Sequence, residues 1–137
     1  MTTEVEARDA IVGLIETEFT SLPRYYEDTE CVDLDSVGTG FVRIEINFND
    51  TYQVTLGANF IDRTWGLVVV SIFSKDGDGA RAALQARDDL KAMVKSAIAA
   101  FSPAGVQLVM AKPGDVERKK GWVRRELLIP FWFDSNA

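Results

Sequence analysis

The chain has 137 residues, 47% hydrophobic and 26% charged, which is close to the average for globular proteins and predicts one folded domain over 1–137 rather than a disordered or fibrous chain. Its 15 basic and 21 acidic side chains give a net charge of −6, so nucleic acid and anionic membranes should repel the molecule as a whole. There is no histidine and Cys31 is the only cysteine, which excludes Ser-His-Asp and Cys-His catalysis, imidazole zinc sites and internal disulfides.

The charge is divided unevenly along the chain. Residues 1–50 carry 12 acidic and 3 basic side chains, whereas residues 51–137 carry 9 acidic and 12 basic ones. The acidic N-terminal residues lack the basic and then apolar pattern of a signal peptide, and the longest apolar stretch, 65–73, has about half of the roughly 20 residues that a membrane helix needs. With its single cysteine, the composition predicts a soluble intracellular protein in which Cys31 fills apolar space.

Apolar residues at steps of three and four predict an amphipathic helix over 3–21, with Thr2 or Thr3 as its N-cap and Pro23 beyond its end. The polar and acidic segment 24–40 indicates a long surface loop, with a short strand at 31–34. Strict alternation then predicts a half-buried strand over 42–48.

Asn49-Asp50 is a turn signal, and alternation resumes over 52–56, so we expect a β-hairpin at this point. The stretch 66–73 is continuously apolar and β-branched, which is typical of a central strand covered on both faces. A second amphipathic helix is expected over 80–101, followed by a short strand over 106–110 and a charged loop over 112–121.

The last predicted strand, 122–133, alternates again. Pro130 lies within it and has no N–H to donate, which indicates an edge strand or a bulge. The predicted fold class is α+β, a mostly antiparallel (mixed) sheet of about five strands packed against two amphipathic helices.

Segment 77–82 matches G-x-G-x-x-A between a strand and a helix, the position of a dinucleotide-binding turn. No acidic residue follows about 20 positions on, and Asp76 and Asp78 would repel a pyrophosphate. We therefore favour an ordinary turn in which Asp78 caps the helix. A calcium loop is disfavoured because its third ligand position is Ala80, so neither a cofactor nor a metal is expected.

The segment 118–125 places five cations around an indole: Arg118, Lys119, Lys120, Trp122, Arg124 and Arg125. Such a mixture can bind single-stranded nucleic acid, but a net charge of −6 favours a solvated hairpin or a surface for a protein partner. Nothing singles out two of the 21 acids as an acid–base pair, and S-x-x-K and G-x-S-x-G are both absent. We therefore predict that the protein is not an enzyme.

Several segments together resemble a known family. The opening helix leads to the strand Phe41-Val42-Arg43-Ile44-Glu45-Ile46, then to Arg63-Thr64-Trp65-Gly66 before an apolar strand, a glycine-rich turn and a long helix. The chain closes with Gly121-Trp122 running into Ile129-Pro130-Phe131-Trp132-Phe133-Asp134. In this arrangement the chain resembles, over nearly its whole length, the tail terminator (tail completion) proteins of long-tailed bacteriophages.

The resemblance implies a structural protein of the virion that assembles as a hexameric ring on the end of the tail tube. The ring would stop tail polymerisation and then present the surface for head–tail joining. Its partners would be copies of itself, the tail tube protein and the head-side connector, with DNA only in transit through the lumen and no membrane. It would reside in the neck region of the tail, and in the host cytoplasm during assembly.

The divided charge suggests how such a ring could close, because complementary patches on neighbouring subunits favour one order of assembly. The leading interface candidates are the acidic Glu27, Asp28, Glu30, Asp33 and Asp35, the basic and aromatic residues of 118–125, and Arg63. The alternatives are a head-completion or connector adaptor protein of the phage neck, and a small nucleic-acid-binding module that uses the basic segment.

Overall fold

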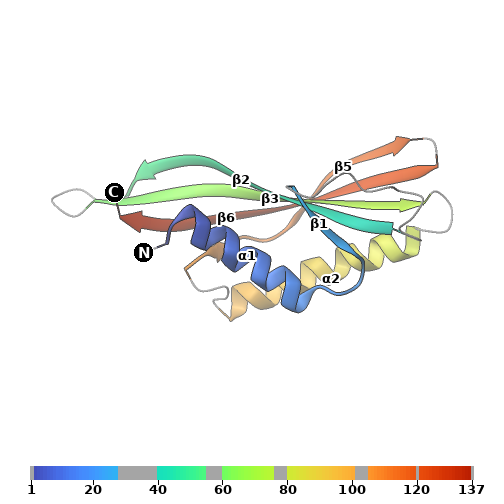
Figure 1. The fold of residues 1–137 in the computed structure, drawn as a ribbon, viewed down its shortest axis with the longest axis horizontal. Helices are drawn as coiled ribbons and strands as arrows, with labels where there is room; N and C mark the ends of the chain where they lie inside the picture. The colour runs from blue at the N-terminus through green and yellow to red at the C-terminus, as the bar shows by residue number, and fades with distance from the viewer. Residues whose placement is uncertain are drawn as a thin grey trace.

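The alternating and helical patterns of the sequence form an α+β domain in the computed structural model, which describes residues 2–27, 40–54, 60–75, 80–100, 105–119 and 121–136. Its elements in chain order are α1 Glu4–Glu18, β1 Arg24–Tyr26, β2 Gly40–Gln53, β3 Ile61–Lys75, α2 Ala80–Ala99, β4 Gln107–Leu108, β5 Lys112–Lys119 and β6 Trp122–Asn136. Both helices lie on one side of the sheet that these strands form (Figure 1). The predicted fold class is therefore confirmed, with six strands in place of about five.

The sheet has the strand order β1-β2-β3-β6-β4, and β5 pairs with the part of β6 that β4 leaves free. Strand β1 is parallel to β2, whereas the other pairings are antiparallel. Strand β3 lies in the centre, as its apolar sequence predicts. Neither helix of the described structure is both long and apolar enough to cross a membrane.

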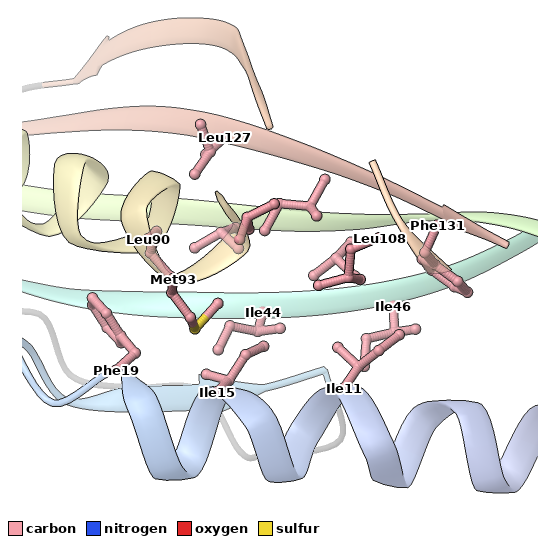
Figure 2. Packing of buried hydrophobic residues seen from close by; sticks show 14 of the residues in the cluster. Ile11, Ile15, Phe19, Ile44, Ile46, Leu90, Met93, Leu108, Leu127 and Phe131 are labelled. Carbon is pink, nitrogen blue, oxygen red and sulfur yellow. The ribbon is translucent and has the colours of Figure 1, made fainter. Parts of the chain in front are cut away.

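Helix α1 begins at the predicted cap, since the Thr3 hydroxyl accepts a hydrogen bond from the Glu6 N–H at 3.2 Å. The core lies between the helices and the sheet, where alternate residues of the long strands face the apolar stripes of α1 and α2. Figure 2 shows this packing through Ile11 and Ile15 of α1, Phe19 directly after α1, Leu90 and Met93 of α2, and Ile44, Ile46, Leu108, Leu127 and Phe131 of the sheet.

Two segments that were predicted as loops are strands. In β1, which lies in the predicted loop 24–40, Tyr25 packs edge-on against Phe41 and the Tyr26 hydroxyl donates a 2.6 Å hydrogen bond to Glu16. That hydrogen bond, together with Arg24, lowers the pKa of Glu16. The predicted loop 112–121 is largely the edge strand β5, whose mostly exposed, charged side chains give no hydrophobic period. The predicted strand at 31–34 and the predicted cap Asp78 lie outside the described residues.

The turn predicted at Asn49-Asp50 is wrong, because β2 continues through these residues to Gln53. Its pairing with β3 shifts register between Phe48 and Thr51, so that two residues of β2 lie opposite one residue of β3. This is a β-bulge. Asn49 and Asp50 disfavour regular strand backbone, and such residues occur at bulges as well as at turns. A bulge reverses the alternation of side chains, and it places Tyr52 on the face away from the helices.

Pro130 does not lie in an edge strand, since β6 has neighbours on both sides. It pairs with Leu67 on one side, and on the other its carbonyl accepts a 2.8 Å hydrogen bond from the Val109 N–H. Val109 lies between β4 and β5, so the missing N–H of Pro130 falls where the neighbour of β6 changes from one short strand to the other.

Candidate protein-interaction surfaces

One face of the long strands carries no described helix or strand, and we call it the open face (Figure 1). The sequence predicts cover on both faces of β3. Within the described ranges the helices cover one face, and the side chains of β3 on the other face are half-buried. The open face consists of Phe41, Arg43, Glu45, Asn47 and Tyr52 of β2; Arg63, Trp65, Leu67, Val69, Ser71, Phe73 and Lys75 of β3; and Trp122, Arg124, Glu126, Leu128, Pro130, Trp132 and Asp134 of β6.

At one end of the open face, five residues form what we call the aromatic cluster: Tyr52, Arg63, Trp65, Trp132 and Asp134. Arg63 and Asp134 are joined by two hydrogen bonds of 2.8 and 3.0 Å, and the Arg63 guanidinium carbon lies 3.9 Å from the centre of the Trp132 ring. The Trp65 indole N–H donates to the Tyr52 hydroxyl at 2.8 Å, and the two tryptophan rings are 6.3 Å apart. Trp, Tyr and Arg in contact are the residues that dominate binding energy at protein interfaces.

The local sequence explains how the aromatic cluster forms. Arg63 and Trp65 are two residues apart in β3, as are Trp132 and Asp134 in β6, so each pair lies on one face of its strand. The hydrogen bond to Asp134 raises the pKa of Arg63, which keeps the guanidinium charged. Gly66 lies on the opposite face, where an added Cβ would be 2.3 Å from the Phe131 ring.

Acidic neighbours pair with part of the positive charge of the basic segment 118–125. Arg124 donates to Glu117 at 2.8 Å and to Glu126 at 2.7 Å, and the Lys119 ammonium lies 3.4 Å from Glu117. These cations lower the pKa of Glu117, chiefly through the hydrogen bond from Arg124. The expected group of five cations around an indole therefore contains acidic partners from β5 and β6.

The structure also separates Arg124 from Arg125. Arg124 and Trp122 lie on the open face, whereas Arg125 lies on the helix side and donates to the buried Ser74 hydroxyl at 3.4 Å. Arg118 and Lys119 are exposed near the end of β5, and Lys120 lies outside the described residues. The basic segment is thus divided between two faces and one edge of the sheet.

Of the acidic segment, only Glu27 belongs to the described residues. It accepts hydrogen bonds from Arg8 at 3.2 Å and from the Ile46 N–H at 3.0 Å. The carboxylate thus pairs with an N–H of β2 beyond the last residue that β1 pairs with. The other predicted acids, Asp28, Glu30, Asp33 and Asp35, lie outside the described residues.

Glu27 and the two cations at the end of β5, Arg118 and Lys119, lie at opposite edges of the sheet. One row of paired residues runs from Arg24 in β1 through Val42, Ile72 and Arg125 to Val116 in β5. Glu27 directly follows β1, and Arg118 and Lys119 lie at the far end of β5. Predicted interface residues of opposite charge therefore occur on the two edges of one sheet.

Enzyme sites usually contain buried polar side chains, metal ligands or a pocket. The only buried polar side chains among the described residues are Thr64 and Ser74, and no group of described acidic side chains could hold a metal ion. Strand β3, which precedes the G-x-G-x-x-A segment, has antiparallel neighbours on both sides and not the adjacent parallel strand of a dinucleotide fold. A groove of about 510 Å³ lies between α1 and α2, where Ser21 donates to Asp89.

Arg63 was identified from the sequence as an interface candidate, but Tyr52, Trp65, Trp132 and Asp134 were not. The spacing of two residues in Arg63-x-Trp65 and Trp132-x-Asp134 could have indicated a shared face. The pairing of the two strands, which brings the motifs together, is a long-range contact that this spacing does not give.

No family model matches the chain, and no curated protein matches it by sequence. Among solved structures, a chain whose name states no activity is similar, with a TM-score of 0.60 and 15% identity over 92% of this chain and 94% of that chain. At this identity the likeness supports the fold alone. The chain has the α+β fold of that solved structure.

Proposed function

We propose that the protein is a structural subunit that forms a ring on the end of a phage tail tube, ending tail polymerisation and providing the surface for head–tail joining. The observation that carries this proposal is the placement of Glu27 on one edge of the sheet and of Arg118 and Lys119 of β5 on the opposite edge. The family resemblance of the sequence supplies the biological setting.

Opposite edges are what a ring requires. In a cyclic assembly every subunit contacts its neighbours through two different surfaces, and these must lie on opposite sides of the subunit. Opposite charges on the two surfaces favour the head-to-tail contact and disfavour contacts between like edges. Four further acids, Asp28, Glu30, Asp33 and Asp35, follow Glu27 in the sequence, and a charge exchange described below tests their part in this contact.

The interface can be tested by charge reversal at the β5 edge. The variant R118E/K119E should form smaller assemblies than the parent protein in multi-angle light scattering, with the difference decreasing as salt is raised. Its control is R81E/K95E, which makes the same change of charge at exposed positions of α2. Equal masses for the two variants would count against the proposal.

A second step uses the acidic edge. If the edges contact each other, D33K/D35K added to R118E/K119E should restore assembly, because the charges are then exchanged rather than removed. Failure of this rescue, with both variants folded, would assign the loss to something other than an edge-to-edge contact.

The role on the tail needs a test on the virus. Electron micrographs of particles made without this protein should show tails of abnormal length, whereas normal tails detached from heads would point to a head-completion adaptor instead. The nucleic-acid alternative predicts binding of single-stranded DNA in fluorescence anisotropy at low salt. We expect little binding, because Glu117 and Glu126 are paired with Arg124 in the basic segment.

A further inference from the structure

We infer that the open face is a docking surface for a second copy of this chain, so that two molecules pack sheet against sheet. This contact is separate from the two sheet edges and does not rest on the proposed ring. It assigns a partner to a sheet face that no described helix or strand covers.

The composition of the open face indicates that it is covered in use. Its middle rows place Val69 beside Leu128 and Leu67 beside Pro130, and Trp65 and Trp132 follow in the next row. The middle of β3 is apolar on both faces, as in sheets that are buried on both sides, yet its open-face side chains are only half-buried whereas those on the helix side are buried. Large apolar patches of this kind mark interaction sites in soluble proteins.

The size of the open face fits a contact between two copies. Strands β3 and β6 have 15 residues each and β2 has 14. At about 3.4 Å per residue and about 4.8 Å between strands, the face measures about 50 by 14 Å, or about 700 Å². A standard stable interface buries about 800 Å² on each partner, and two such faces approach that area although Phe41, at one end of the face, is already buried.

The charge of the open face also favours a second copy. It holds four cations, Arg43, Arg63, Lys75 and Arg124, and three anions, Glu45, Glu126 and Asp134. Three ion pairs form between residues of the open face: Arg63 with Asp134 at 2.8 Å, Arg124 with Glu126 at 2.7 Å and Arg43 with Glu45 at 3.8 Å. The face is thus nearly neutral although the chain has a net charge of −6, and two copies meet there without the repulsion expected elsewhere.

The first experiment separates this contact from the edges. In the R118E/K119E background, analytical ultracentrifugation should show a dimer, and adding Val69→Arg should convert it to a monomer. Val116→Arg is the control, because Val116 is 56% exposed on β5 and lies outside the open face. A monomer already in the R118E/K119E background, or equal masses for the Val69 and Val116 variants, would overturn the inference.

The second experiment does not depend on a large substitution. Val69 lies next to the middle of β3, and full overlap of two copies requires their symmetry axis to pass near the middle of the face. The variant C31S/V69C should therefore form an intermolecular disulfide under mild oxidation, whereas C31S/A92C, with its thiol on the exposed side of α2, should not. Equal cross-linking of the two variants, or none in the Val69 variant, would contradict a sheet-to-sheet dimer, whether or not the protein caps a tail.

Discussion

Arg63 and Asp134 are far apart in the sequence, yet they are directly paired across β3 and β6 and joined by two hydrogen bonds of 2.8 and 3.0 Å. The guanidinium carbon of Arg63 lies 3.9 Å from the centre of the Trp132 ring, and the bidentate contact with Asp134 holds it there. The pair therefore fixes the orientation of an aromatic side chain on a surface that has no described cover, which is how an interface residue is preorganised before binding.

Replacing Asp134 by Asn should lower the midpoint of thermal unfolding and change the near-ultraviolet circular dichroism of the tryptophans. The double variant R63Q/D134N should be hardly less stable than either single variant, since both remove the same contact. Arg43 and Glu45, 3.8 Å apart on the same face, are the comparison and should show weaker coupling. Additive effects of the Arg63 and Asp134 changes would mean that the pair contributes nothing as a unit.

Replacing Gly66 by Ala should destabilise the protein strongly. The new Cβ would lie 2.3 Å from the Phe131 ring and 2.6 Å from the Asn47 carbonyl oxygen, and the fully buried Phe131 has little room to move. Overpacking of this kind costs about 1–3 kcal/mol, which denaturant unfolding can measure. In Gly13→Ala, the control in α1, the Cβ meets nothing within 4 Å, and about 0.5–1 kcal/mol should be gained. Equal effects of the two changes would refute this explanation of Gly66.

The order of the main elements could be predicted from the sequence because each depends on local patterns. The helices α1 and α2 follow from apolar residues at helical spacing, and β2, β3 and β6 from alternation or apolar runs. Strand β5 could not be predicted, because an edge strand with mostly exposed side chains has no hydrophobic period. The residue types at Asn49-Asp50 do not distinguish a bulge from a turn, because both features favour the same residues.

The candidate surfaces could be predicted only in part. Charge counting identified Glu27 and the basic segment, and pairing of strands was needed to place them on opposite edges. The same counting could not show that Arg124 is neutralised by Glu117 and Glu126, because this depends on which strand lies beside β6. The apolar run of β3 indicated cover on both faces, and that expectation now points to a partner.

Deleting Asn49 should leave the protein folded. The two residues Asn49 and Asp50 lie opposite one residue of β3, so removal of one of them makes the ladder regular without moving Thr51 from Thr64 or Tyr52 from Arg63. The hydrogen bond between Trp65 and Tyr52 should persist, which tryptophan fluorescence can follow through the effect of Tyr52→Phe. Asn49→Ala serves as the control without a change in length. Loss of the fold on deletion would indicate that these residues form an essential turn.

The stability of the β5–β6 hairpin should depend on acidic pH through Glu117. Its pKa is lowered in the folded protein, mainly by the hydrogen bond from Arg124 and then by Lys119. A carboxylate with a lowered folded pKa adds stability above its unfolded pKa, about 4.3, and that stability is lost as the pH falls through the folded pKa. Parent protein and Glu117→Gln should therefore differ in thermal midpoint at pH 6 and converge as the pH falls below the folded pKa of Glu117.

Asp115→Asn is the matched control for this pH dependence, because it removes another carboxylate of β5 that makes no described contact with Arg124. The pH dependence that Glu117→Gln removes should remain in this variant. Chemical shifts of the Glu117 side chain would locate the titration directly and should show a midpoint below that of a model glutamate. A midpoint at or above the ordinary value would mean that Arg124 does not hold Glu117 in solution, and the basic segment would then have more free charge for a partner than the structure gives it.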